Sequence, residues 1–147
     1  MSIKTIFLDR DGVINKDKNY LYKIDDFEFI TGIFESCNHF QKLGYKIIVI
    51  TNQSGLSRGF YNKKDFIKLS NWMLNQFKIR GIDILDIFYC PHNSDSDCKC
   101  RKPKPGMFLQ AQEKYNINMK KSWMIGDKDI DIYASNAAGV KNTILLR

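Results

Sequence analysis

Acidic side chains directly follow two of the predicted strands. Asp9 and Asp11 are two positions apart on chain that leaves a strand, so their side chains share one face. A third carboxylate, Asp127, follows a later strand. Carboxylates this close repel one another, which favours a cation among them, and carboxylate and carbonyl oxygens suit Mg²⁺. The Asp-x-Asp-Gly motif alone is as consistent with a solvated turn as with a metal site.

Together with these carboxylates, a hydroxyl group and a lysine would make a set of residues suited to phosphoryl transfer. Thr51 follows the second predicted strand, and Lys102 lies in a loop that contains two prolines. Phosphoryl transfer requires charge stabilisation at the equatorial oxygens and an in-line nucleophile. A metal-bound aspartate is a competent nucleophile, and a second carboxylate can protonate the leaving oxygen and then deprotonate water. The residue types therefore predict a metal-dependent phosphoryl-transfer site.

Three of the four cysteines fall within eleven residues, together with a histidine. In cytosolic chains such a group indicates metal binding more often than disulfides. Two close pairs of nitrogen and sulfur ligands suit a closed tetrahedral Zn²⁺ site, here with a structural role. The predicted ligands are Cys90, His92, Cys98 and Cys100. Zinc would hold the loop that continues into Arg101 and Lys102, whereas Cys37 is predicted to lie in the core.

The composition is that of one domain spanning residues 1–147, with 44% apolar and 27% charged residues. No apolar run approaches the roughly 20 residues of a membrane span, so we expect no membrane partner. The N-terminal segment reaches charged residues too early for a signal peptide, which favours the cytoplasm. The net charge of +7 is spread over both halves and forms no basic tail.

Short apolar runs alternate with helical patterns along the chain. This alternation is typical of an α/β fold with a parallel sheet and right-handed crossovers. The functional groups named above would then meet beyond the carboxyl ends of the strands, where such sheets bind ligands. Strands are predicted over 4–8, 46–50, 84–89, 122–125 and 143–146, helices over 33–43, from Asn62 to Gly81, over 106–115 and over 129–138, and a hairpin or irregular loop over 13–30.

Four segments resemble, in order, the four motifs of the haloacid dehalogenase phosphatase superfamily. The segments are FLDRDGVIN at 7–15, VITNQSGLSRG at 49–59, CRKPKPGM at 100–107 and MIGDKDID at 124–131. They are most similar to the D-glycero-D-manno-heptose 1,7-bisphosphate 7-phosphatases and next to the histidinol-phosphate phosphatases, and both families carry a zinc site of this kind. The resemblance covers essentially the whole chain and implies a Rossmann-like three-layer sandwich.

The length also bears on the architecture, because many members of the superfamily carry a separate cap domain. Here the intervals 11–51 and 51–102 are filled by core elements and short loops. We therefore expect a capless core with an open site, whose specificity is set by loops 13–27, 54–60 and 91–105.

The resemblance also implies a role for each matching residue. Asp9 would be the nucleophile and a Mg²⁺ ligand. Asp11 would be the general acid and base and give its backbone carbonyl to Mg²⁺, and Asp127 would be the remaining protein ligand. Thr51 and Lys102 would hold the phosphoryl group and neutralise its charge. The implied substrate contacts are Asp17, Lys18, Asn19, Tyr20, Asn52, Gln53, Ser54, Arg101 and Lys128; Gln53 and Ser54 are equally consistent with only shaping their loop.

The implied reaction is Mg²⁺-dependent hydrolysis of the heptose 7-phosphate through an aspartyl-phosphate. It would serve the synthesis of nucleotide-activated heptose for lipopolysaccharide or other surface glycans. The expected partner is a small phosphorylated sugar, and the expected state is a monomer.

Three alternatives remain at this point. The five-residue gap between His92 and Cys98 looks more like the histidinol-phosphate phosphatases of histidine biosynthesis. A zinc-containing nucleic-acid binding module fits the positive charge, but its strand-end carboxylates would repel phosphates unless a metal were bound. A DNA 3′-phosphatase shares the superfamily motifs, yet the chain has no broad basic or aromatic tract, so nucleic acid is not the expected partner.

Overall fold

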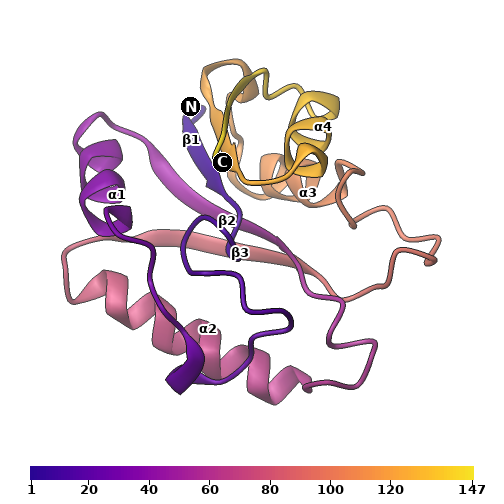
Figure 1. The fold of residues 1–147 in the computed structure, drawn as a ribbon. Coiled ribbons are helices and arrows are strands. Elements are labelled where there is room, and N and C mark those ends of the chain that lie inside the picture. The colour runs from indigo at the N-terminus through magenta and orange to yellow at the C-terminus, as the bar shows by residue number, and fades with distance from the viewer.

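Five short strands pair in one parallel sheet in the order β3-β2-β1-β4-β5 (Figure 1). The computed structural model describes all residues from 1 to 147. The strands are β1 (Thr5–Leu8), β2 (Lys46–Asn52), β3 (Ile84–Cys90), β4 (Trp123–Gly126) and β5 (Asn142–Leu145). The parallel α/β architecture predicted from the sequence is confirmed.

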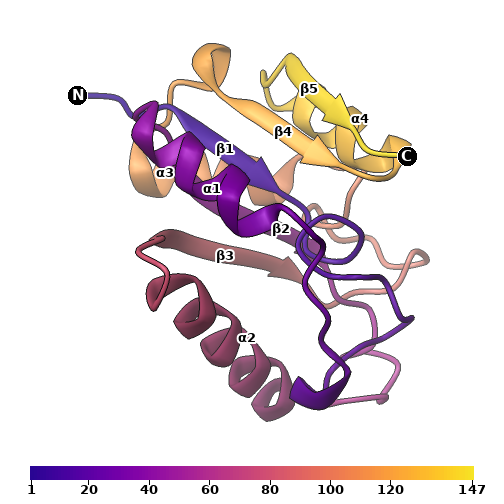
Figure 2. The same ribbon diagram turned by 60° about the vertical axis from the view of Figure 1, so that its left-hand side comes forward.

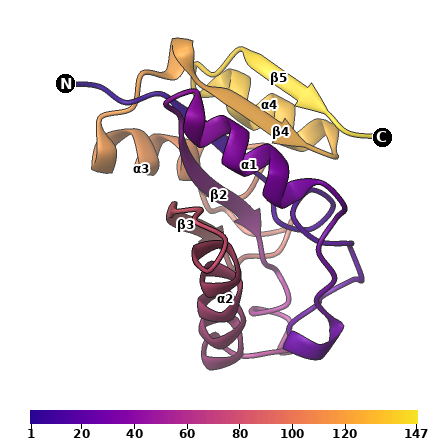
Figure 3. The ribbon, with the colours of Figure 1, turned by 90° about the vertical axis from the view of Figure 1, so that its left-hand side faces the viewer.

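Helices cover both faces of this sheet. They are α1 (Ile33–Lys42), α2 (Lys63–Lys78), α3 (Gly106–Tyr115) and α4 (Asp129–Ala137), with short 3-10 turns η1 (Ile24–Asp26) and η2 (Met119–Lys121). Buried side chains of α1 and α2 share one apolar core, and those of α3 and α4 share the other. Figures 2 and 3 show α1 in front of the strands and α4 behind them. The result is the three-layer sandwich that the superfamily resemblance implies.

The interior strand β2 shows why the sheet has two cores. Its four consecutive residues from Ile47 to Ile50 are completely buried. Ile47 and Val49 join the α1 and α2 core, while Ile48 and Ile50 join the α3 and α4 core. Alternate side chains of a strand point to opposite faces, so a continuous β-branched run is what a doubly covered strand requires.

The predicted strand boundaries are correct to within one residue except at the end of β2. The strand expected to end at residue 50 continues to Asn52, because Thr51 and Asn52 pair with Tyr89 and Cys90 of β3. Thr51 is therefore the penultimate residue of β2 rather than the first residue after it. Ladder pairing with the neighbouring strand extends β2 beyond its apolar run.

The segment 13–30, predicted to be a hairpin or an irregular loop, is an irregular loop. It contains η1 and isolated bridges from Asn15 to Asp11 and Phe29. Apolar side chains along it are buried and extend the α1 and α2 core, namely Val13, Ile14, Leu21 and Phe27. No separate cap domain is formed between residues 11 and 51 or between 51 and 102. None of the helices is long and apolar enough to cross a membrane.

The start of α2 offers a test of local stability. The Asn62 side chain accepts from the Asp65 N–H at 2.9 Å, and the Asp65 carboxylate accepts from the Asn62 N–H at 3.0 Å. We predict that Asn62→Ala lowers the free energy of unfolding by about 1 kcal/mol, because it leaves helix N–H groups uncapped. Urea unfolding measures this. The exposed mid-helix Asn71→Ala is the matched control and should not destabilise; equal losses in both variants would contradict the cap's role.

Candidate active site

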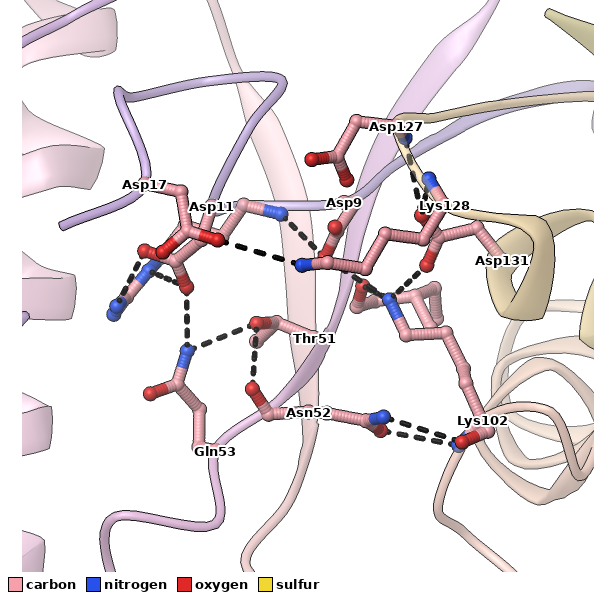
Figure 4. Close-up of polar contacts among 12 residues, drawn as sticks. Asp9, Asp11, Asp17, Thr51, Asn52, Gln53, Lys102, Asp127, Lys128 and Asp131 are labelled. Atoms are coloured by element: carbon pink, nitrogen blue, oxygen red, sulfur yellow. Dashed lines mark hydrogen bonds and ion pairs between the residues drawn. The ribbon is translucent and has the colours of Figure 1, made fainter. Parts of the chain in front are cut away.

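The polar ends of β1, β2 and β4 meet at one edge of the sheet because these three strands are neighbours. A cavity of about 230 Å³ opens there, and Figure 4 shows the contacts among its central residues. It is lined by Asp9, Arg10, Asp11, Asp17, Asn19, Tyr20, Asn52, Gln53, Ser54, Tyr61, Arg101, Lys102, Lys128, Ile130 and Asp131. Most of the residues predicted from the sequence are thus brought together.

A buried ammonium group lies at the base of this cavity. Lys102 Nζ is 2.9 Å from Asp9 Oδ1, 2.7 Å from Asp131 Oδ1 and 3.0 Å from the backbone oxygen of Ile50. The Lys102 side chain is only 2% exposed. Burial by itself would lower the pKa of Lys102, but the two carboxylates raise it above its usual value. Lys102 therefore stays cationic and provides a fixed positive charge beside Asp9.

The backbone of Lys102 is held in place by Asn52. The Asn52 amide nitrogen donates to the Lys102 carbonyl at 3.3 Å, and the Lys102 N–H donates to Asn52 Oδ1 at 3.1 Å. This reciprocal pair joins the end of β2 to the loop that carries Lys102. Asn52 lines the cavity, as expected of a substrate contact, but both ends of its amide are already engaged by the protein.

Asp131 is a central residue that the sequence reasoning missed. Its Oδ2 accepts from the backbone N–H groups of Asp127 and Lys128, both at 3.1 Å. A Cβ added at Gly126 would lie 2.4 Å from the Asp131 Cβ, so the glycine gives this side chain its room. The sequence did contain a signal for Asp131, namely its place in the first turn of a predicted helix. A carboxylate there interacts favourably with the free N–H groups of the helix start.

Three carboxylates form a group that can hold a divalent cation. One oxygen each from Asp9, Asp127 and Asp131 lie within 4.8 Å of one another. The oxygens of Asp131 are engaged by Lys102 and by backbone donors, whereas Asp127 Oδ1 is buried with no partner in the protein. A Cβ at Gly12 would lie 2.0 Å from Asp127 Oδ2, so the glycine leaves space for that carboxylate. The free Asp127 oxygen beside Asp9 fits a Mg²⁺ ligand pair.

The charge on the cavity wall supports this fit. Four carboxylates and four cationic side chains line the cavity, so a divalent cation would make it net positive and suited to phosphate. Burial raises the pKa of the Asp9 carboxyl, the Lys102 ammonium opposes this rise, and the neighbouring Asp131 adds to it. A second positive charge beside Asp9 would favour its ionised form.

The Asp11 carboxylate points away from this acidic group. Arg10 donates to its two oxygens at 3.1 and 3.2 Å, Asn15 donates at 3.0 Å and Gln53 donates at 3.2 Å. The predicted contribution of Asp11 to a metal is its backbone carbonyl, which this side-chain direction leaves possible. Arg10 and Asn15 were not singled out from the sequence, and no spacing rule marks them.

The rim of the cavity carries further predicted residues. Lys128 Nζ lies 3.4 Å from Asp17 Oδ2, which joins the 13–30 segment to the turn after β4. Asn19, Tyr20, Ser54 and Arg101 also line the cavity. Three predicted residues are not part of the lining. Thr51 is 1% exposed, Lys18 pairs with Glu28 at 3.4 Å, and Asp127 belongs to the acidic group with Asp9 and Asp131.

The four predicted zinc ligands converge beside the cavity. The Cys90 and Cys100 sulfurs each lie 3.4 Å from His92 Nδ1, and the Cys90 and Cys98 sulfurs are 3.7 Å apart. Each of the four residues offers a ligand atom within 4.8 Å of the others. Three thiols and one imidazole nitrogen that converge in this way are the ligand types of a closed zinc site.

The same loop carries Arg101, which is held through the zinc-ligand segment. Arg101 Nη1 donates to the His92 carbonyl at 3.2 Å. A Cβ at Gly106 would lie 2.2 Å from the Lys99 carbonyl oxygen, so the loop packs directly on the start of α3. The shape of the loop therefore sets where the Arg101 guanidinium lies.

Comparisons with known proteins agree with this geometry. Residues 4–143 match the family model described as polynucleotide kinase 3 phosphatase. A D-glycero-alpha-D-manno-heptose-1,7-bisphosphate 7-phosphatase of Photorhabdus laumondii is 49% identical over 99% of this chain and 83% of its own length. The beta-anomer enzyme of Vibrio cholerae is 46% identical over 100% and 83%.

The fold is similar to that of a solved phosphatase structure. The D,D-heptose 1,7-bisphosphate phosphatase of B. bronchiseptica, complexed with magnesium and phosphate, superposes with a TM-score of 0.87. It is 32% identical, and the match covers 93% of this chain and 77% of that one.

The contacts of Asp131 lead to a test. In Asp131→Asn, an amide N–H₂ must face either the Lys102 ammonium or the backbone N–H groups, so a donor meets a donor. We predict a loss of about 1–3 kcal/mol in the free energy of unfolding, measured in urea. Asp129→Asn, an exposed site in the same helical turn, is the matched control and should change stability far less. Equal stability of the two variants would contradict the role given to Asp131.

Proposed function

Because this chain belongs to the polynucleotide kinase 3 phosphatase family, and within it to the heptose-bisphosphate phosphatases, we propose that it is a Mg²⁺-dependent phosphatase. Its substrate is D-glycero-D-manno-heptose 1,7-bisphosphate, from which it removes the 7-phosphate. The observation that carries this proposal is the buried Lys102 ammonium against Asp9, next to the unpartnered oxygen of Asp127. In this proposal Asp9 is the nucleophile, Lys102 is the fixed cation and Asp127 is a metal ligand, all at one edge of the sheet.

The proposed reaction has two steps at phosphorus. An Asp9 carboxylate oxygen attacks the phosphorus while the bond to the sugar oxygen breaks, and Asp11 gives its proton to that leaving oxygen. The Asp11 carboxylate then takes a proton from water, which attacks the aspartyl-phosphate and releases phosphate and free Asp9. Lys102 neutralises phosphoryl charge in both steps, and Thr51 holds the phosphoryl group.

Mg²⁺ would be held by the carboxylates of Asp9 and Asp127 and by the backbone carbonyl of Asp11. When bound, it supplies positive charge that offsets the negative charge of the phosphoryl group and the carboxylates. The magnesium and phosphate in the B. bronchiseptica relative support this assignment.

Substrate recognition is assigned to the loops around the open cavity. Loops 13–27, 54–60 and 91–105 contribute the segment Asp17 to Tyr20, together with Ser54 and Arg101, and Lys128 reaches the rim from the turn after β4. Cationic groups at the rim suit a substrate that carries a second phosphate. We propose that the enzyme is a monomer and that it acts in the cytoplasm. Its product would serve the synthesis of nucleotide-activated heptose for lipopolysaccharide or other surface glycans.

The alternatives differ in their support. The relatives described above act, by name, on heptose bisphosphate, and none of them is named for histidinol phosphate. The matching family model is named for a polynucleotide 3′ phosphatase, which keeps a 3′-phosphorylated oligonucleotide in the assay as a competing substrate.

Zinc is proposed as a structural ion in this single domain of residues 1–147, within a loop at 90–100. Cys90, His92, Cys98 and Cys100 would bind it. By fixing the loop, the ion would fix the Arg101 guanidinium, which hydrogen-bonds to the His92 carbonyl, and would support Lys102.

Asp9→Asn tests the reaction mechanism. The amide is nearly isosteric but cannot act as the carboxylate nucleophile, so we predict that phosphate release falls by at least about 10³-fold. Phosphate release with Mg²⁺ is measured in parallel on heptose bisphosphate, histidinol phosphate and a 3′-phosphorylated oligonucleotide. Asp83→Asn, an exposed carboxylate before β3 and outside the cavity lining, is the control and should keep wild-type rates. Full activity of Asp9→Asn would contradict the mechanism, and a preference for another substrate would contradict the assigned specificity.

Cys98→Ser tests the zinc assignment. Loss of one thiolate ligand should release most of the metal and lower the melting temperature, because metal binding contributes to folding. Metal analysis of the purified protein gives zinc per chain. Cys37→Ala removes a buried thiol from the α1 core and should keep its zinc, whatever its stability. Unchanged zinc content in Cys98→Ser would contradict the site.

A further inference from the structure

Gln53 and Tyr61 form a largely buried polar pair in the wall of the cavity. We propose that this pair positions the Asp11 carboxyl group for proton transfer, with Gln53 and Tyr61 as positioning residues rather than substrate contacts. The inference rests on the proposed function, in which Asp11 is the general acid and base.

The Gln53 amide is fully used inside the protein. Its Nε2 donates to Asp11 Oδ2 at 3.2 Å and to Thr51 Oγ1 at 2.9 Å, and Figure 4 shows both contacts. The residue is only 3% exposed. Its two amide hydrogens are therefore directed at the proposed acid and at the threonine assigned to the phosphoryl group. An amide held in this way has no donor left for a sugar hydroxyl.

Tyr61 determines which way the Gln53 amide points. Its hydroxyl donates to Gln53 Oε1, and the residue is only 5% exposed. Burial raises the pKa of the Tyr61 phenol to about 12, so the group stays protonated and can donate. With the oxygen of Gln53 facing Tyr61, its N–H₂ group must face Asp11. The opposite orientation would place a carbonyl oxygen against the Asp11 carboxylate, which is repulsive.

The position of Tyr61 is in turn fixed by the two neighbouring loops. A Cβ at Gly55 would lie 2.2 Å from the Tyr61 ring, so the glycine allows this close approach. The ring of Tyr22 stacks on that of Tyr61, with centroids 5.6 Å apart and planes 17° apart. The pair thus connects loops 54–60 and 13–27, which surround the substrate, to the carboxyl group of Asp11.

Arg10 and Asn15 also hold Asp11, but from the other side. Arg10 and Asn15 both donate to Oδ1, and Arg10 Nε also reaches Oδ2. Gln53 is the donor to Oδ2 that comes from β2's side of the cavity. Without it, Oδ2 keeps only its contact with Arg10 Nε, so the direction of this oxygen is less constrained.

This role has a kinetic signature that a purely structural role lacks. A sugar alkoxide leaves poorly unless it is protonated, whereas p-nitrophenolate leaves without help from an acid. The ratio of kcat/KM on heptose bisphosphate to kcat/KM on p-nitrophenyl phosphate therefore reports on the general acid. A lower fraction of folded enzyme reduces both values equally and leaves the ratio unchanged.

The experiment compares Gln53→Leu and Tyr61→Phe with the wild type. We expect Gln53→Leu to lower the ratio by about tenfold or more, within the range that general acid catalysis contributes. Tyr61→Phe removes one oxygen and acts through the amide, so it should lower the ratio by a smaller factor. The double variant should be no worse than Gln53→Leu, because both changes interrupt one relay.

Tyr115→Phe is the matched control, since its hydroxyl bonds to Asp86 at 2.7 Å and takes no part in the cavity. It should leave the ratio at the wild-type value. Unchanged ratios in both Gln53→Leu and Tyr61→Phe would overturn the proposal, as would strictly additive effects in the double variant. If Gln53→Leu does not fold, the ratio measured for Tyr61→Phe tests the proposal by itself, and an unchanged ratio overturns it.

A readout without activity separates this inference from the proposed function. Hydrogen exchange of the Gln53 side-chain amide, followed by NMR, should be faster in Tyr61→Phe than in the wild type. An unchanged exchange rate would overturn the relay even in an active enzyme. A wild-type chain that hydrolyses neither phosphate ester contradicts the proposed function, while faster exchange in Tyr61→Phe would still support the hydrogen-bond pair.

Discussion

The structure depends on one buried positive charge. Lys102 Nζ lies between Asp9 and Asp131 and also reaches the carbonyl of Ile50, so β1, β2 and α4 meet at a single ammonium group. A lysine taken out of water is costly unless carboxylates compensate it, and two carboxylates this close need a cation between them. The burial of Lys102 therefore depends on Asp9 and Asp131, and the close approach of these two carboxylates depends on Lys102. The same mutual dependence holds Asp9, the proposed nucleophile, at the cavity.

Much of this arrangement could be read from residue order. The β-branched run at 47–50, the Asp-x-Asp-Gly turn and the Cys and His spacing each reflect a local requirement that few other residues meet. A parallel sheet then brings the strand ends together without further information. The expected architecture followed because backbone periodicity and strand order depend on short segments.

Side-chain direction was harder to predict, because it depends on groups far away in the chain. Asn52 and Gln53 were implied substrate contacts, with loop shaping an equal alternative for Gln53. Both line the cavity, and their amides engage Lys102 and Asp11, which are 50 and 42 residues away. Asp131 was missed although it stands in the first turn of α4, since its importance comes from a lysine in another loop. The end of β2 likewise depends on pairing with β3 rather than on its own composition.

Four glycines surround the cavity, and each faces a group that matters. Added side-chain carbons would meet Asp127 at Gly12, Tyr61 at Gly55, the Lys99 carbonyl at Gly106 and Asp131 at Gly126. A redesign of the cavity must therefore keep glycine at these four positions, because a larger residue at any of them would displace a neighbouring group.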